Sequence, residues 1–261
     1  MLLRKDGPDV IAIPQPSHAW LSGQMARAWG NAHFAAPTPR EEVCLAAEQH
    51  DIGWHSWELA PALDPGTGLP QEFFKVPPKA HIALWREGVR RARAFGCYPA
   101  LLVSLHADTI YARYFDFTKA SVENASAVRA FLDEQHRFQA QLIASLCANA
   151  ENGPQASPKN VARNQLLIAA LDWISLEICW GVTTEKTIPD VPMSGDHGVG
   201  LSLRRGGGDD LVLDPWPFRE ASLIVCAEGK RLRGRFLSQD DLARALDAAE
   251  PVRVTVTLHR A

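Results

Sequence analysis

The spacing of hydrophobic and polar residues along the chain changes near residue 190. In the first part, apolar side chains recur every three or four positions, which predicts amphipathic helices. We expect these helices over residues 17–32, 38–51, 81–96, 99–115, 125–150 and 158–180, after a short strand at 9–15. The last helix, QLLIAALDWISLEICW, is apolar almost all round, so we place it at the centre of the helical part.

Beyond residue 190, apolar and polar residues alternate as they do in strands with one buried face. The alternation runs through residues 210–218, 220–232, 233–237 and 252–260, with one short helix at 238–249 among them. We therefore predict a mainly α protein. Residues 1–190 form a helical domain in this prediction, and residues 191–261 form a small β-rich C-terminal subdomain packed on it.

Composition and charge narrow the classes of function. Of the 261 residues, 46% are hydrophobic and 22% charged, as in ordinary globular proteins. The net charge of −3 and scattered basic residues give no reason to expect nucleic acid, and no apolar stretch approaches transmembrane length. Five dispersed cysteines without a CxxC pair predict reduced thiols and a cytoplasmic protein. A small molecule is the expected partner, and the number of helices suits a homodimer.

The predicted helix over residues 38–51 ends in an adjacent histidine and aspartate, His50 and Asp51, followed by Gly53. One explanation is local: a polar pair at a helix end, with Gly53 as the cap. The other is that both side chains share a bound cation.

Asp172 favours the second explanation. It lies in the apolar central helix, and no lysine or arginine occurs within one helical turn of it. Because an unpaired buried carboxylate costs several kcal/mol, Asp172 needs a positively charged partner. A metal ion supplies that charge.

Six residues on predicted helices or helix ends form a candidate ligand set of imidazoles and carboxylates. This chemistry suits Fe, Mn, Ni, Zn or Mg in a catalytic site, and the number of ligands allows one or two ions. The six are His18, His50, Asp51, His81, His106 and Asp172.

The order of these residues resembles the H…HD…D signature of the HD-domain superfamily of metal-dependent phosphohydrolases. His50–Asp51–Ile52–Gly53 is similar to its frequent HDIG form, and His81 and His106 resemble the extra ligands of its dinuclear members. The resemblance implies an HD-domain-like helical bundle with a dinuclear centre. With QHDIGW, LLVSLH and DPWPF, the whole chain also resembles an uncharacterised bacterial family of unknown function.

One departure concerns the lysine that many HD phosphohydrolases carry after HDIG, because Trp54 occupies that place. Trp54 and Trp57 are either a substrate-stacking wall or, as is more common, part of the core. Arg113 and Lys75 are then the cations expected to offset substrate charge. His55 is expected to support the ligands or face the substrate.

The leading hypothesis is a metal-dependent hydrolase, acting on a small-molecule phosphoester through a metal-activated water, with Asp51 as the bridging or orienting carboxylate. The second is a mixed-valent diiron oxygenase of the HD superfamily, similar to myo-inositol oxygenase. The third is a non-catalytic protein in which the metal only holds helices together.

Overall fold

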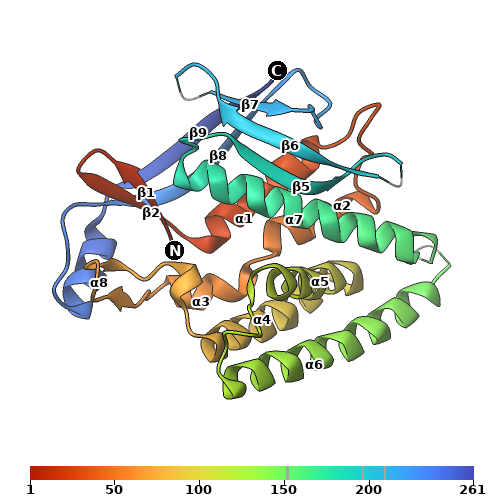
Figure 1. The fold of residues 1–261 in the computed structure, drawn as a ribbon, viewed down its shortest axis with the longest axis horizontal. Helices are drawn as coiled ribbons and strands as arrows, with labels where there is room; N and C mark the ends of the chain where they lie inside the picture. Colours follow the sequence, from red (N-terminus) through yellow and green to blue (C-terminus); the bar gives the residue numbers. More distant parts are fainter. Residues whose placement is uncertain (151–152, 196, 209) are drawn as a thin grey trace.

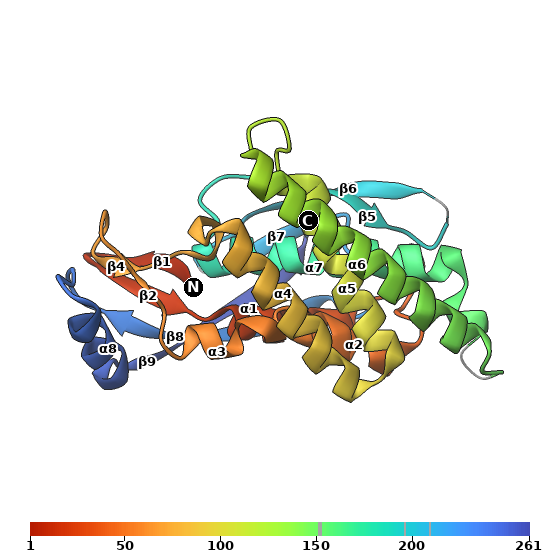
Figure 2. The same cartoon turned by 90° about the horizontal axis from the view of Figure 1, so that it is seen from below.

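The computed structural model describes residues 1–150, 153–195, 197–208 and 210–261, and shows most of its helices packed on one side of a seven-stranded sheet (Figure 1). The helices are α1 (Gln15–Ala28), α2 (Arg40–Gln49), α3 (His55–Glu58), α4 (Pro78–Ala92), α5 (Cys97–Tyr114), α6 (Val122–Cys147), α7 (Pro158–Trp180) and α8 (Gln239–Ala248). Seen from below, α4, α5 and α6 form a further helical layer beyond α1 and α7 (Figure 2). Short 3-10 helices are η1 (Ile52–Trp54), η2 (Phe73–Lys75), η3 (Arg93–Phe95) and η4 (Pro154–Ala156).

The large sheet joins the two ends of the chain. Its strands are β1 (Leu2–Asp6), β2 (Asp9–Ile13), β5 (Lys186–Pro192), β6 (Gly198–Arg205), β7 (Leu211–Asp214), β8 (Ser222–Leu232) and β9 (Pro251–Arg260). They lie in the order β1-β2-β8-β9-β7-β6-β5, with β7 and β9 parallel and the other neighbours antiparallel. A second sheet has only β3 (Leu63–Asp64) and β4 (Leu69–Pro70).

The prediction of a mainly α bundle with a small β-rich subdomain is therefore wrong, because the structure is an α+β fold with a large sheet. Periodicity identified β7, β8 and β9 but missed β5 and β6, the strand expected at residues 233–237 is a loop, and the pattern did not reveal which strands pair. Val10, Ile11 and Ala12 of β2 pair with β8, more than 200 residues later, so the N-terminal strands extend the C-terminal sheet. The boundary expected at residue 190 falls inside β5, and the two-domain division stays a prediction.

Strand β5 escaped prediction for a physical reason. Its sequence, KTIPDVP, contains two prolines, which cannot donate to a strand ladder and usually argue against a strand. The structure accommodates them because β5 is an edge strand, paired only with β6. Ile188 and Val191 of β5 are fully buried, so the strand still contributes to the core.

One hydrophobic core connects the helices to the sheet. It includes Leu21 of α1 and Ile174 of α7, which pack with Val225 and Leu258 of the sheet. A second core forms between α4, α5 and α6, around residues such as Phe131. Among the residues that the structure describes, no helix has the length and apolarity needed to cross a bilayer.

Candidate metal centre

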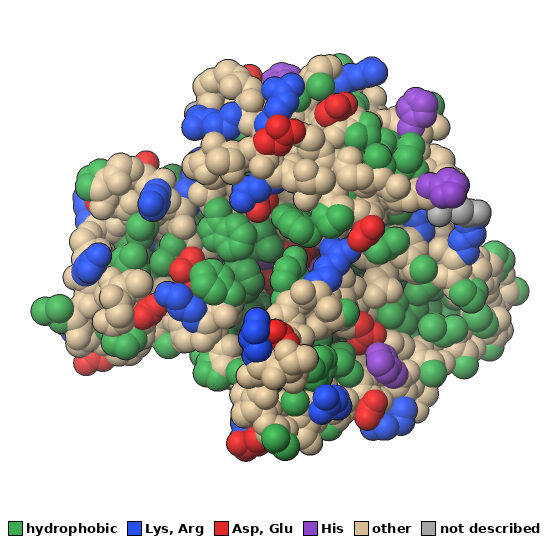
Figure 3. All heavy atoms as spheres, viewed as in Figure 1, with side chains coloured by type: hydrophobic (Ala, Val, Ile, Leu, Met, Phe, Trp, Pro, Cys, Tyr) green, Lys and Arg blue, Asp and Glu red, His purple; other side chains and the backbone are tan. Residues whose placement is uncertain are grey.

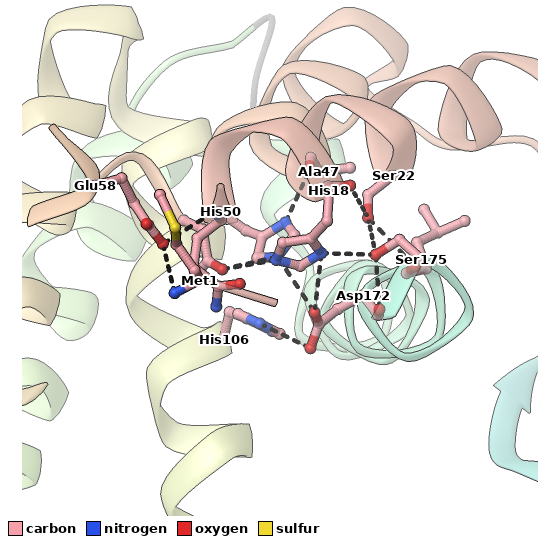
Figure 4. A network of polar contacts seen from close by, with 12 residues as sticks. Met1, His18, Ser22, Ala47, His50, Glu58, His106, Asp172 and Ser175 are labelled. Carbon is pink, nitrogen blue, oxygen red and sulfur yellow. Dashed lines mark hydrogen bonds and ion pairs between the residues drawn. The ribbon is translucent and has the colours of Figure 1, made fainter. Parts of the chain in front are cut away.

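Five of the six predicted ligands meet where α1, α2, α5 and α7 converge (Figure 4). We call them the His/Asp cluster. Every member is buried, with at most 7% of its surface exposed. The members are His18 on α1, His50 directly after α2, Asp51 before η1, His106 on α5 and Asp172 on α7.

His50 presents its Nε2 atom to the cluster. Its Nδ1 donates to the carbonyl oxygen of Ala47 at 2.8 Å, and a carbonyl can only accept. The neutral imidazole therefore carries its proton on Nδ1 and leaves the Nε2 lone pair free. Nε2 is buried without a hydrogen-bond partner among the described residues. Such an atom is a ready metal ligand.

His18 is fixed in the same way. Ser175 Oγ donates to the carbonyl oxygen of Asp172 at 2.7 Å, so it accepts from His18 Nδ1, which lies 2.9 Å away. Ser22 supports Ser175 with a further hydrogen bond of 3.0 Å. His18 Nε2 then faces Asp51 Oδ2 at 2.8 Å. In both histidines the outer nitrogen, Nδ1, is hydrogen-bonded to the protein, and the inner nitrogen, Nε2, points at a carboxylate.

The remaining distances in the cluster are too long for hydrogen bonds and close to those around an ion. His50 Nε2 lies 3.4 Å from Asp172 Oδ1 and 3.8 Å from Asp51 Oδ2, and His106 Nε2 lies 3.5 Å from Asp172 Oδ2. Good hydrogen bonds to nitrogen are shorter, at about 2.7–3.2 Å. Ligand bonds of about 2.0–2.3 Å separate neighbouring ligand atoms by roughly 3.0–3.6 Å. The residues therefore fit a divalent cation.

The electrostatics of the cluster call for positive charge. Burial disfavours a charged His50, yet the carboxylates of Asp51 and Asp172 outweigh it and raise the pKa of His50 to about 9. Burial also opposes ionisation of both aspartates. The histidines outweigh it: His50 and His18 hold the pKa of Asp51 below its usual range, and His106 and His50 lower that of Asp172. With no other cation, protons on the imidazoles supply the charge that a metal would replace.

Two overlapping groups have the proximity that a metal requires. His18, His50 and Asp51 form one, and His50, His106 and Asp172 form the other, with ligand atoms within 4.8 Å of one another in each group. The donor atoms of both groups are nitrogen and oxygen, without a thiolate, and this set suits Fe, Mn, Ni, Zn or Mg. The prediction that these residues could hold a metal is supported, while the identity and number of ions stay predictions.

Gly53 positions the cluster, but not as the helix cap that its place suggested. It lies within η1 and is not in the left-handed conformation. A Cβ at Gly53 would overlap the carbonyl oxygen of Leu84 and come within 3.0 Å of the backbone of Gly88. Glycine is therefore required because the backbone after Asp51 packs directly against α4.

His81 lies beside the cluster and outside both groups. Trp85 Nε1 donates to His81 Nε2 at 3.2 Å, and His81 Nδ1 lies 3.1 Å from the hydroxyl of Tyr111. The lone pair that a metal needs is therefore occupied by Trp85. Burial lowers the pKa of His81 to about 4, which keeps the ring neutral near pH 7. Its expected role as a ligand stays a prediction.

The cations expected to meet the substrate point elsewhere. Lys75 Nζ lies 2.6 Å from Asp64 Oδ2, and Arg113 is 3.7 Å from Asp190. His55 is exposed at the start of α3. None of the three lines the cavity described next. Asp51 is thus the one predicted catalytic residue that the structure brings to the cluster.

A cavity of about 620 Å³ opens onto the cluster, with Asp51, His106 and Asp172 in its wall. Figure 3 shows hydrophobic side chains gathered around a hollow on this face, with charged side chains at its edge. Trp54 lines the cavity, as the substrate-wall interpretation expected, and is also 97% buried, while Trp57 does not line it.

The sequence interpretation missed most of the cavity wall, including Tyr111, Trp173, Leu176 and Trp180. The last three recur at helical spacing on α7, next to Asp172. That stripe, beginning beside a buried carboxylate, is the signal that could have found the wall.

The profile of a family described as "Protein of unknown function (DUF3891)" matches residues 1–234. This span contains the whole His/Asp cluster and β1 to β8, and it ends before α8 and β9. No curated protein and no solved structure matches the chain.

Proposed function

This chain belongs to the DUF3891 family, and we propose that it is a metal-dependent hydrolase of small molecules. The observation that carries the proposal is the state of His50. Its outer nitrogen is committed to Ala47, and its inner nitrogen is buried, unpartnered and directed at two aspartates. A histidine that only fills space in the core does not need one nitrogen fixed and the other directed at carboxylates, whereas a metal ligand does.

The His/Asp cluster would hold the ion. A bound divalent cation supplies charge that lowers the pKa of water and polarises the bond to be broken. Asp51 and Asp172 reach the cavity, so their carboxylates can orient water there and accept its proton. His18 and His50, anchored by Ser175 and Ala47, keep the cluster in place without rearrangement during turnover.

A relationship to the HD-domain superfamily is part of the proposal. The order of the cluster along the chain, a helix histidine, an adjacent His–Asp pair, a second helix histidine and a late aspartate, supports it. The cavity adds support for catalysis over a purely structural metal, because it gives a substrate access to Asp51, His106 and Asp172.

A diiron oxygenase is the second candidate. The aromatic cavity wall favours it, because the leading hypothesis expects cations beside a phosphoester and the wall provides none among the described residues. Against it, His81 would have to exchange its hydrogen bond from Trp85 for a metal.

The test compares the purified protein with His50→Gln and with the control His33→Gln, which alters an exposed histidine outside the cluster. We expect about one divalent ion or more per chain in the parent and the control, and a loss of most of it in His50→Gln. Hydrolysis of a panel of chromogenic esters should require the metal, disappear with a chelator and return on its addition. Activity that depends on dioxygen would support the oxygenase, and metal-independent hydrolysis would contradict both.

A further inference from the structure

The cavity next to the His/Asp cluster has two chemically different parts. One end is formed by Asp51, His106 and Asp172. Most of the remaining wall is aromatic: Trp54, Phe73, Trp85, Tyr111, Trp173 and Trp180 are among its members. The volume of about 620 Å³ is within the usual range for a pocket that encloses a small organic ligand.

The aromatic wall is held in place by contacts between its rings. Phe73 stacks on Trp180 with ring centroids 5.9 Å apart and an angle of 18° between the planes. Trp54 meets Phe73 edge-on at 6.3 Å. These residues come from η1, η2 and α7, so the wall is assembled from distant parts of the chain. A preformed wall of this kind offers flat apolar surface to a ligand.

The wall carries no positive side chain among the described residues that form it. Its acidic member outside the cluster is Glu177, which lies 3.3 Å from Lys186 and is neutralised by it. The neighbouring cations Lys75 and Arg113 are engaged with Asp64 and Asp190. A phosphate group entering the cavity would lose its water with nothing but the cluster to receive its charge, which is costly.

The mouth of the cavity also carries exposed aromatic side chains. Phe74 and Tyr114 both line the cavity, and they remain 59% and 62% exposed. Large aromatic side chains left in water beside a cavity are typical of a surface that a ligand covers. Aromatic surface therefore extends from the mouth of the cavity toward the cluster, and such surface disfavours strongly hydrated molecules.

We propose that the cavity binds an uncharged, largely apolar molecule with a flat ring system, and presents its reactive bond to the cluster. This names a substrate class for the proposed function and rests on it only for the reaction itself. An anionic phosphoester and a quaternary ammonium compound are the two alternatives that the test must separate, since aromatic walls also bind cations.

Isothermal titration calorimetry distinguishes the three substrate classes with three ligands that share the naphthalene ring system. The ligands are 2-methoxynaphthalene, 2-naphthyl phosphate and (2-naphthylmethyl)trimethylammonium. We expect the neutral compound to bind at least about tenfold more tightly than either charged one. Equal or tighter binding of the phosphate would overturn the proposal in favour of an anionic substrate, and equal or tighter binding of the ammonium compound would overturn it in favour of a cation.

Two wall variants locate the binding. Trp173→Ala should weaken binding of 2-methoxynaphthalene about tenfold or more, whereas Trp20→Ala, a partly buried tryptophan outside the cavity, should leave it within about twofold. If Trp173→Ala fails to fold, Leu176→Lys provides the second test, because a cation in the wall should shift the preference toward 2-naphthyl phosphate. An unchanged preference in a folded Leu176→Lys protein would contradict the proposed binding position.

The titrations measure binding without turnover, so their result does not depend on whether the protein is a hydrolase. Protein stripped of metal by a chelator is titrated alongside the untreated protein. Preference for the neutral ligand without any metal-dependent hydrolysis would sustain the cavity assignment and reject the enzyme. Metal-dependent hydrolysis with preference for the phosphate would do the reverse.

Discussion

The inner end of the cavity and its rim differ in how their charged side chains are buried and paired. At the inner end, residues far apart in sequence converge: His18 and Asp51 are 33 positions apart and 2.8 Å apart in space. At the rim, Lys75 and Arg113 stand next to wall residues in sequence, yet pair with Asp64 and Asp190 away from the cavity. The charged groups of the inner end are buried, whereas those of the rim keep contact with water.

Charged side chains in these two regions therefore contribute differently to stability. Buried charges cost several kcal/mol unless they are paired, so a fold retains such a cluster only if its members satisfy one another or a ligand. Exposed ion pairs contribute about 0–1 kcal/mol. Substitutions at the inner end should therefore have large effects, and substitutions of the rim cations small ones.

The largest effect is expected from Asp172→Ala. It removes a carboxylate that lies within 3.5 Å of both His50 and His106, so metal affinity should fall by roughly a thousandfold, with loss of hydrolysis. Competition with a chromogenic chelator measures the affinity. Asp133→Ala, an exposed position on α6, is the control and should bind metal like the parent. Unchanged affinity in Asp172→Ala would place the metal elsewhere.

Next in size is Gly53→Ala, which tests the backbone that supports the inner end. The new Cβ would collide with the Leu84 carbonyl, so we expect the free energy of unfolding to drop by about 3 kcal/mol. Denaturant titration measures it. Gly207→Ala, where a Cβ meets nothing within 4 Å, should change stability by less than about 0.5 kcal/mol. Similar values for both variants would refute the close approach of η1 to α4.

His81, between the two regions, should make folding sensitive to acid. Its pKa of about 4 in the folded protein lies below the unfolded value of about 6.5. The unfolded chain therefore binds more protons between these values, and stability decreases as the pH falls. Relative to His81→Gln, the parent should lose about 1.5 kcal/mol of unfolding free energy from pH 6.5 to pH 5. Parallel stability curves for the two proteins would show that His81 titrates normally.

The smallest effects are expected at the rim. Lys75→Met and Arg113→Met should each leave kcat/KM for the best ester within about twofold, since neither side chain faces the cavity. Steady-state kinetics on the two variants provides the measurement. A loss of tenfold or more with either variant would restore the role in charge neutralisation that the sequence suggested.

The sequence predicted the inner end better than the fold around it. Asp172 could be recognised because a carboxylate in an apolar helix needs a partner wherever the helix lies. The orientation of Lys75 could not, because a long exposed side chain chooses its partner in space. The same holds for β2, whose pattern indicated a strand but not its pairing with β8. The local pattern of residues predicts which side chains are buried, but it does not predict which distant segments pair.

The proposed chemistry depends on a metal ion bound by the His/Asp cluster. Crystals grown with Mn²⁺ allow such an ion to be located in an anomalous difference map. A bound ion should give a peak within about 2.0–2.3 Å of His50 Nε2 and of a carboxylate oxygen of Asp51 or Asp172. A map with no peak among these residues, at saturating Mn²⁺, would show that the cluster does not hold a metal.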